Sequence, residues 1–296
     1  MHKRLGTGSM SSGSSQNQQS QYQNYSSPNS SYSNGSCSGG NFKVGTLVSY
    51  PKVILFGDSL TQKCMHPEAN WGALVADFLA RKCDVIVRGY SGYNTRKCLA
   101  LLPYLFDGIN FSNNVAALLI CLGTNDASAG QGNESHVPEE EFVENLLMIG
   151  EYFVSRGLNP SKIIMTGPPG FHAPLWEEKA KAMGLSNHIR TNELNQKYSN
   201  LVNEVCKHLK CRNIPLHARM IAADNWQEML IDGLHFGPLG AQFYFNLLQP
   251  HLSHLTYDIP QLMPNWKEFD AAYGNKHGDP DRTVNEWIDN NPYFSQ

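Results

Sequence analysis

Five short runs of apolar residues constrain the fold of this chain more than any other feature of its sequence. Each run is apolar at successive positions rather than at alternate ones, which is typical of strands covered on both faces of a sheet. Segments with the periodicity of amphipathic helices lie between and after these runs. The expected strands are 52–56, 84–87, 115–122, 162–166 and 214–217, and the expected helices are 71–81, 95–104, 139–156, 187–209 and 238–252.

The alternation of strand and helix predicts an α/β fold, in which a parallel sheet lies between two layers of helices. Right-handed crossover connections leave few other arrangements for elements in this order. In open parallel sheets, ligands bind outside the carboxyl ends of the strands. Residues that directly follow a strand are therefore the first candidates for a functional site.

Four segments at or near expected strand ends contain residues suited to chemistry. The first strand is followed by Ser59 in the sequence PKVILFGDSLTQ, and the second by Gly92 in RGYSGYNTR. The third strand is followed by Asn125 in GTND, and His235 lies in DGLH, shortly before the last helix. We expect these residues to lie close together, because the carboxyl ends of parallel strands meet at one edge of a sheet.

Ser59 is the candidate nucleophile, because the chain also offers a base and a group to orient that base. A serine hydroxyl needs a base within hydrogen-bond reach, and the base needs a third group that fixes its orientation. Asp232 and His235 are three residues apart, so both can project from one turn. Alone, such a pair is more often a turn cap and a buried histidine. Together with the other segments, it favours a catalytic triad of Ser59, His235 and Asp232.

Attack on an ester carbonyl develops negative charge on oxygen, and the chain has three candidate donors to that oxyanion. They are the backbone N–H of Ser59, the backbone N–H of Gly92 and the side-chain amide of Asn125. Glycine allows close approach of the backbone, and asparagine supplies a neutral donor. We expect Asp58 to cap the turn after the first strand rather than to act chemically.

In the order of these segments, the chain resembles the SGNH hydrolases, also called the GDSL esterase/lipase family, over roughly residues 50–253. The resemblance implies a five-stranded parallel, flavodoxin-like sheet in the order 2-1-3-4-5 and serine esterase activity. The segments RGYSGYNTR, GTNDA and DGLHFGPLG resemble the branch of isoamyl acetate-hydrolysing esterase homologues. That branch implies short-chain, acetate-type esters. Thioesterase, carbohydrate acetylesterase and phospholipid acyl hydrolase activities remain open within the family.

Aromatic and proline residues near the same strand ends are candidates for a substrate pocket, with ordinary packing as the alternative. These candidates are Tyr90, Tyr93, Pro169, Phe171 and Phe236. A group of potential metal ligands has a spacing that matches no usual zinc site; it comprises Cys206, His208, Cys211 and His217. The sequence also has no phosphate-binding loop, so we expect neither a metal nor another cofactor.

Composition argues against several other classes of protein. A formal net charge of -3 provides no electrostatic reason to bind nucleic acid or an anionic membrane. No apolar run approaches the roughly 18 to 20 residues of a membrane span, and the first residues lack the apolar core of a secretory signal. The seven cysteines show no disulfide-framework spacing, which favours reduced thiols and a cytoplasmic location.

The composition also divides the chain into three parts. Residues 11–40 contain no charged residue, so we expect segment 1–43 to be a disordered, low-complexity tail and 44–253 to be the hydrolase domain. Segment 254–296 contains several large aromatic residues, which we expect to pack on this domain or on a second copy in a homodimer. Two alternatives are a flavin-binding module with the same sheet and a non-catalytic protein that acts through its tail.

Overall fold

The computed structural model describes residues 49–185, 188–273, 286 and 288–289, so the expected tail 1–43 lies outside the described residues. The strands are β1 (Lys52–Gly57), β2 (Asp84–Gly89), β3 (Val115–Cys121), β4 (Ile163–Thr166) and β5 (Arg212–Ile214). The α-helices are α1 (Ser59–Gln62), α2 (Trp71–Phe78), α3 (Thr95–Phe106), α4 (Glu139–Ser155), α5 (Ala173–Ala182), α6 (Asn192–Leu209), α7 (Leu216–Ile221), α8 (Pro238–Leu255) and α9 (Trp266–Tyr273). Two short 3-10 helices are η1 (Pro160–Lys162) and η2 (Trp226–Met229).

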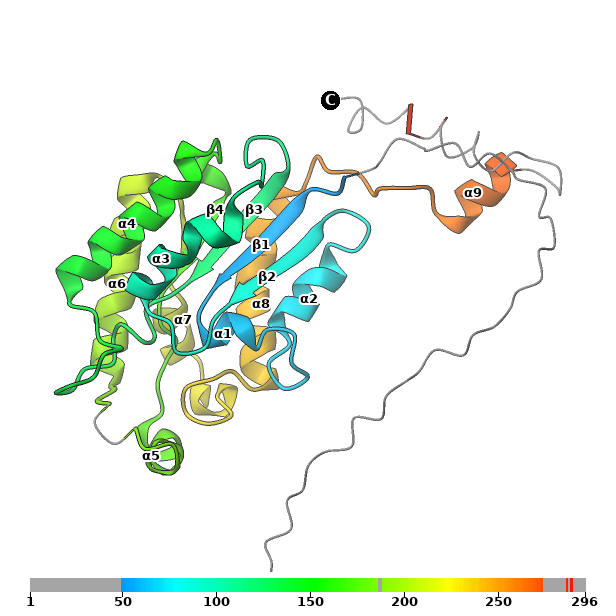
Figure 1. Cartoon of the computed structure of the whole chain (residues 1–296). Helices are drawn as coiled ribbons and strands as arrows, with labels where there is room; N and C mark the ends of the chain where they lie inside the picture. The colour runs from blue at the N-terminus through cyan, green and yellow to red at the C-terminus, as the bar shows by residue number, and fades with distance from the viewer. Residues whose placement is uncertain (1–48, 186–187, 274–285, 287, 290–296) are drawn as a thin grey trace, which may run out of the picture. The chain divides into compact units, whose positions relative to one another are not determined.

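The strands form one parallel sheet in the order β2-β1-β3-β4-β5, which confirms the predicted fold (Figure 1). The chain runs outward from β1 to β2, returns to the other side of β1, and then continues outward through β3, β4 and β5. The direction of winding therefore changes between β1 and β3. In sheets of this kind, ligands bind at the carboxyl ends of the strands beside this change.

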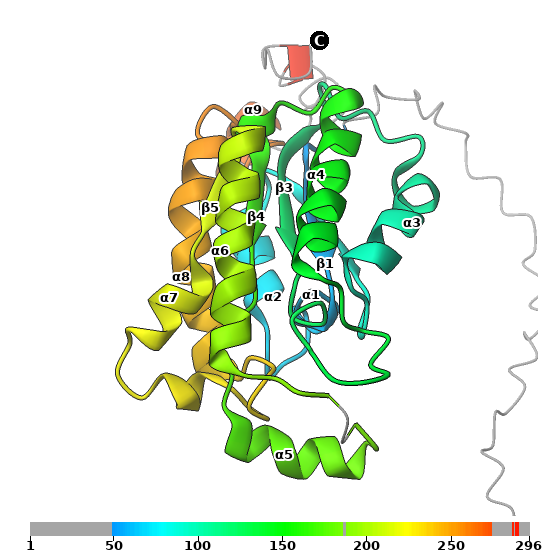
Figure 2. The same cartoon turned by 90° about the vertical axis from the view of Figure 1, so that its left-hand side faces the viewer.

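Helices cover both faces of the sheet: α3, α4 and α6 lie on one face, and α2 and α8 lie on the other (Figures 1 and 2). Side chains of β1 alternate between the two faces. Val53 and Leu55 join the core beneath α2 and α8, whereas Ile54 and Phe56 join the core beneath α3 and α4. β3 is buried at every position, so its apolar run is continuous.

The last expected strand, 214–217, is wrong. β5 comprises Arg212–Ile214, and helix α7 begins directly after Pro215. β5 is the last strand of the sheet and is only half-buried at its first two positions, so polar residues are tolerated there and a search for apolar runs misses it. Leu216 and Met220 are apolar because they enter the core from one face of a helix.

The segment between β4 and α6 also differs from the expectation. It contains a helix that the sequence did not predict, α5, and α6 begins at Asn192 rather than at residue 187. Thr191 caps α6, because its Oγ1 accepts a hydrogen bond of 3.2 Å from the N–H of Leu194. α5 buries only Trp176 and Ala180, so its amphipathic pattern is too weak to distinguish it from a polar loop.

Residues near the beginning of segment 254–296 contact the domain, while the packing of its aromatic residues on the domain or on a second copy stays a prediction. Leu262 is fully buried, and its N–H donates to the carbonyl of Arg81 at 2.6 Å. The guanidinium of Arg81 donates in turn to the carbonyl of Met263 and to Oε1 of Gln261. Trp266, at the start of α9, remains 71% exposed. The helices in the described part of the chain include none that is both long and apolar enough to cross a membrane.

Two glycines allow α1 to pack directly on the ends of β1 and β2. A Cβ on Gly57 would lie 2.3 Å from the carbonyl oxygen of Cys121 and 2.4 Å from Oγ1 of Thr61. A Cβ on Gly89 would lie 2.0 Å from the backbone nitrogen of Gln62. Because α1 begins with Ser59, the position of that serine depends on the absence of both side chains.

Replacing Gly89 with alanine should destabilise the fold by about 2 to 3 kcal/mol, because the new Cβ meets backbone that cannot rotate away. Denaturant unfolding would measure this loss. Gly237→Ala is the matched control, since the nearest atom to a Cβ at Gly237 is 3.7 Å away, which is an ordinary contact. Equal free energies of unfolding for the two variants would contradict the proposed packing.

Candidate active site

Ser59 is the first residue of α1 and follows the end of β1 directly. Asp58 caps this helix, because its Oδ1 accepts a hydrogen bond of 2.9 Å from the N–H of Leu60. The backbone N–H of Ser59 belongs to the first turn of the helix, where N–H groups have no partner within the helix. The strand end and the cap therefore hold both the hydroxyl of Ser59 and a backbone donor in place.

His235 lies between Ser59 and Asp232. Its Nε2 is 2.9 Å from Oγ of Ser59, and its Nδ1 is 2.8 Å from Oδ2 of Asp232. A carboxylate can only accept, so Nδ1–H donates to Asp232 and Nε2 is left to accept the serine proton. The structure thus brings together the three residues of the predicted triad, although Ser59 and His235 are 176 positions apart.

The turn that carries Asp232 and His235 is held by its own backbone. Oδ1 of Asp232 accepts from the N–H of Leu234 at 3.1 Å and from the N–H of His235 at 2.7 Å, which leaves Oδ2 for the imidazole. Gly233 has a φ of 83°, and a Cβ there would lie 2.3 Å from the carbonyl oxygen of His172. Asp232 therefore both caps the turn and orients the base.

Burial and charge set the pKa values of this pair. Burial alone would raise the pKa of Asp232, but hydrogen bonds from His235 and Lys179 hold that pKa well below its usual range. The pKa of His235 is lowered, first by burial and also by the charges of Lys63 and Lys179, although Asp232 opposes the shift. His235 is therefore neutral at neutral pH, as a general base must be.

Helix α5 supplies two contacts to the triad that the sequence did not predict. Lys179 forms an ion pair with Oδ2 of Asp232, the same oxygen that faces His235. The ring of Trp176 lies edge-on to the ring of His235, with 6.2 Å between their centroids. No local pattern identifies these residues, because Lys179 and Asp232 are 53 positions apart and meet only in the folded chain.

Asn125 follows β3, and its side-chain amide is fixed at both ends. Nδ2 donates to the carbonyl of Tyr93 at 2.8 Å, and Oδ1 accepts from Nη2 of Arg190 at 3.2 Å. Arg190 also donates to the carbonyl of Thr124. These contacts determine which way the amide faces and leave the second N–H of Nδ2 for another acceptor. Sequence reasoning missed Arg190, which is 65 positions from Asn125.

Gly92 lies in the loop after β2 with a φ of 78°, a backbone conformation that favours glycine. The neighbouring Ser91 donates from its N–H to Oε1 of Gln62 at 2.7 Å, which ties this loop to α1. Ser59, Gly92 and Asn125 therefore follow three adjacent strands of the sheet. Their joint role as oxyanion donors stays a prediction.

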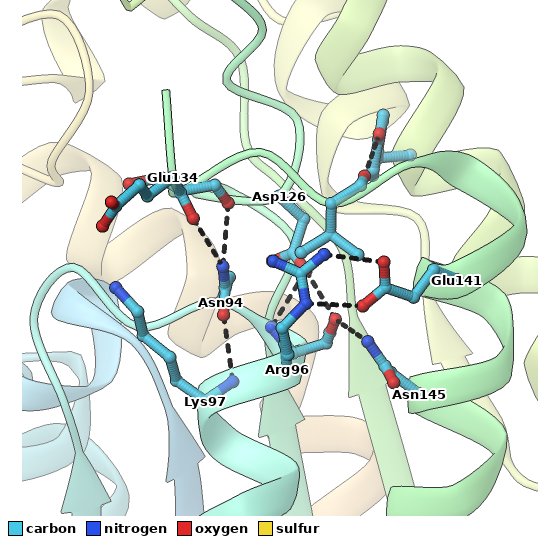
Figure 3. Close-up of polar contacts among 11 residues, drawn as sticks. Asn94, Arg96, Lys97, Asp126, Glu134, Glu141 and Asn145 are labelled. Carbon is cyan, nitrogen blue, oxygen red and sulfur yellow. Dashed lines mark hydrogen bonds and ion pairs between the residues drawn. The ribbon is translucent and has the colours of Figure 1, made fainter. Parts of the chain in front are cut away.

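A polar network fastens the loop after β3 to the beginning of α3 (Figure 3). Asp126 accepts from the N–H and the hydroxyl of Thr95, at 2.9 and 2.6 Å. Asn94 donates from its side chain to the carbonyl of Ser135 at 3.0 Å. Because Asn125 directly precedes Asp126, this network also restrains the candidate oxyanion donor.

Three of the five residues predicted to line a substrate pocket are aromatic residues in loops after β2 and β4. Phe171 lines a pocket beside α5. The rings of Tyr90 and Tyr93 contact each other, with 5.4 Å between their centroids, and pack on the core beneath α3 and α4. Phe171 therefore remains a candidate for substrate contact, whereas the two tyrosines also have a packing role.

The other two predicted pocket residues have structural contacts. The carbonyl of Pro169 accepts from Nδ2 of Asn195 at 3.0 Å. Phe236 is 1% exposed, and its ring centroid lies 5.6 Å from that of Tyr244 in the core. We therefore assign Phe236 to core packing, the alternative considered from the sequence.

A parallel sheet in this order, with serine, histidine and aspartate gathered at its carboxyl edge, defines the class of SGNH ester hydrolases. The sequence model of the GDSL-like Lipase/Acylhydrolase family matches residues 55–243. The chain belongs to this family and is a carboxylic ester hydrolase.

Several proteins are similar to the chain over most of their length. The isoamyl acetate-hydrolyzing esterase 1 homolog of Mus musculus is 34% identical over 230 residues, which cover 77% of this chain and 92% of that protein. Its Homo sapiens counterpart is 33% identical over 229 residues, with the same two coverages. The GDSL esterase/lipase WDL1 of Oryza sativa subsp. japonica is 30% identical over 227 residues, covering 76% of this chain and 85% of that protein.

Solved structures share the fold at lower sequence identity. A lipase/acylhydrolase from Enterococcus faecalis superposes with a TM-score of 0.54 at 20% identity, over 72% of this chain and all of that chain. The acetyl xylan esterase AlAXEase superposes with a TM-score of 0.54 at 15% identity, over 67% of this chain and 98% of that chain. At such identities the likeness concerns the fold alone.

If Asn125 is an oxyanion donor, replacing it with alanine should lower kcat by about 100- to 1000-fold with little change in KM, because the amide would donate mainly to the transition state. Steady-state kinetics on an ester substrate would measure both constants. Asn200→Ala, at an exposed position of α6, is the control and should leave them unchanged. A change confined to KM would mean that Asn125 binds the ground state instead.

Replacing Lys179 with methionine should move the acid limb of the kcat/KM profile to higher pH, because a positive charge that lowers the pKa of His235 is removed. Asp232 and Lys63, the other charged groups that act on His235, would remain. Lys179→Arg keeps the charge and should keep the profile. An unshifted acid limb in Lys179→Met would show that Lys179 has no electrostatic effect on the base.

Proposed function

We propose that this protein hydrolyses short-chain carboxylic esters, including acetate esters, through an acyl-enzyme intermediate on Ser59. The observation that carries the proposal is the position of His235, whose Nε2 lies 2.9 Å from Oγ of Ser59 while its Nδ1 faces Asp232. This geometry supports Ser59 as the nucleophile, His235 as the base and Asp232 as the orienting carboxylate.

In the acylation step, Oγ of Ser59 attacks the carbonyl carbon of the ester while Nε2 of His235 takes the hydroxyl proton. Negative charge develops on the carbonyl oxygen, where Asn125 and the backbone N–H groups of Ser59 and Gly92 would donate. The tetrahedral intermediate then breaks its bond to the alcohol oxygen. The leaving alcohol takes the proton from His235, and the acyl group stays on Ser59.

In the deacylation step, water replaces the alcohol. His235 takes a proton from the water molecule as its oxygen attacks the acyl carbon, and the same oxyanion donors act again. The bond to Oγ of Ser59 then breaks, the carboxylic acid leaves, and His235 returns its proton to the serine. Asp232 remains ionised throughout and stabilises the protonated imidazole, which agrees with its lowered pKa.

The names of relatives support acetate esters as substrates. The mouse and human proteins that match this chain are both named for hydrolysis of isoamyl acetate. Thioesters, acetylated carbohydrates and phospholipids are the alternative substrates, since the same triad serves any acyl transfer to water. Membership in an ester hydrolase family provides no support for the flavin-binding or non-catalytic alternatives.

We further propose a cytoplasmic location. The cysteines within the described part of the chain are free, which suits a reducing compartment; they are Cys64, Cys83, Cys98, Cys121, Cys206 and Cys211. The homodimer and the tail 1–43 remain predictions from the sequence.

A fluorophosphonate probe should label Ser59, and Ser59→Ala should lose both the label and the hydrolysis of p-nitrophenyl acetate while keeping its melting temperature. Peptide mass spectrometry would identify the labelled residue. Ser91→Ala is the matched control, because Ser91 is an exposed serine in the neighbouring loop and should be dispensable. Labelling of Ser91 or of a cysteine, with Ser59→Ala still active, would refute the proposed nucleophile.

A further inference from the structure

Arg190 is a buried arginine in the segment between α5 and α6, and it contacts the candidate oxyanion donor. Its side chain is only 9% exposed. Nη1 donates to the carbonyl of Thr124, and Nη2 donates to Oδ1 of Asn125 at 3.2 Å. Burying a guanidinium is unfavourable unless its donors have suitable acceptors. An arginine in this place therefore indicates a role that depends on its charge and its hydrogen bonds.

Backbone hydrogen bonds hold the segment of Arg190 against the loop after β3. The N–H of Ala129 donates to the carbonyl of Ile189 at 2.9 Å, and the N–H of Ile189 donates to the carbonyl of Ala129 at 2.8 Å. These two residues form an isolated antiparallel bridge. Thr191, on the other side of Arg190, caps α6. Because both neighbours of Arg190 are fixed, its side chain reaches Asn125 from a defined position.

The guanidinium of Arg190 also lies over the ring of Trp176, with 5.7 Å between its Cζ and the ring centroid. Trp176 in turn packs edge-on against His235. The face of an aromatic ring attracts a cation, and a planar guanidinium keeps its hydrogen bonds in such a contact. Arg190 is therefore restrained by α5 as well as by the loop that carries Asn125.

Arg190 and Tyr93 together determine the orientation of the Asn125 amide. A guanidinium can only donate, so it faces Oδ1 of Asn125, whereas the carbonyl of Tyr93 can only accept and faces Nδ2 at 2.8 Å. If the amide were rotated by half a turn, donors would face the guanidinium and two oxygens would face each other. The contacts therefore exclude that rotation and leave the second N–H of Nδ2 to donate to another acceptor.

The charge of Arg190 strengthens this amide as a donor. Burial lowers the pKa of Arg190 to about 10, so it remains a cation at neutral pH. A cationic donor at Oδ1 withdraws electron density from the amide, and hydrogen bonds in such a series reinforce one another. Asp58 and Asp126 also interact with this charge, but in the described part of the chain neither carboxylate forms an ion pair with the guanidinium. The contact of Arg190 with Asn125 is direct.

We propose that Arg190 is a positioning residue for ester hydrolysis and acts through Asn125. It holds the amide in the orientation that donates to the carbonyl oxygen of the ester, and its charge strengthens that hydrogen bond as negative charge develops on the oxygen. This rests on the proposed function, in which Asn125 is an oxyanion donor. Because the oxygen carries more charge in the transition state than in the bound ester, Arg190 should affect kcat more than KM.

A double-mutant cycle between Arg190 and Asn125 tests the proposal, with p-nitrophenyl acetate as the substrate. Arg190→Met should lower kcat by about 10- to 100-fold with little change in KM, because a hydrogen bond to a charged group is lost. In the Asn125→Ala background, the same replacement should lower kcat by about threefold or less, since the amide through which Arg190 acts is absent. Arg212→Met is the matched control: Arg212 also donates to a backbone carbonyl, that of Ser161, but it begins β5 and should leave both constants unchanged.

Melting temperatures establish which variants are folded. If Arg190→Met does not fold, Arg190→Lys replaces it in the cycle, because lysine keeps the buried charge but lacks the fork that reaches both acceptors. Arg190→Lys should lower kcat by about threefold or more in the otherwise unaltered protein and have no effect in Asn125→Ala. Equal losses of kcat in the two backgrounds would overturn the proposal, since a purely structural role does not depend on the amide of Asn125. An unaltered protein that hydrolyses no ester would instead refute the proposed function, on which the inference rests.

Discussion

The position of β1 between β2 and β3 determines where the reacting groups can meet. The last residue of β1, Gly57, pairs with Gly89 of β2 and with Cys121 of β3, so the three strands end at one level. Ser59, the first residue of α1, follows β1, and Gly92 and Asn125 lie in the segments that follow β2 and β3. Because Gly57 and Gly89 leave no space for a Cβ, α1 and its first residue Ser59 pack closely against this edge of the sheet.

Two fully buried aspartates, Asp58 and Asp126, follow β1 and β3, and burying their charge is unfavourable. Burial raises the pKa of Asp58 to about 7 and that of Asp126 to about 6, even though both accept hydrogen bonds. The folded protein therefore holds these protons more tightly than the unfolded chain does. Their contribution to stability is present at acid pH and declines as the pH rises from about 4 to about 7. Arg190 interacts electrostatically with both aspartates and donates a hydrogen bond to Asn125, so a positive charge lies next to that amide.

Local patterns predicted β1 and β3, which are covered on both faces, and also the half-buried β2, but they missed β5 and α5. β1 and β3 show continuous apolar runs because helices cover both of their faces. β5 at the sheet edge and α5 on the rim bury few residues, so neither stands out from its surroundings. The triad was also predicted from local features of the sequence, since Ser59 comes directly after a buried strand and Asp232 lies three positions from His235. Lys179 and Arg190 are long-range partners that leave no such local mark.

By itself, the sequence determined the class of fold, the strand order through a family resemblance, and the candidate residues for the chemistry. These features are encoded locally, in periodicity, in short motifs and in residue type. Only the tertiary structure decided the distance from His235 to Ser59, which ring nitrogen of that histidine faces Asp232, and the contacts of α5 with the predicted triad. It also decided that Phe236 belongs to the core and that Trp176 and Arg190 line one pocket. Such contacts join residues distant in the chain, and their geometry depends on how helices pack on the sheet, which no local stretch of sequence specifies.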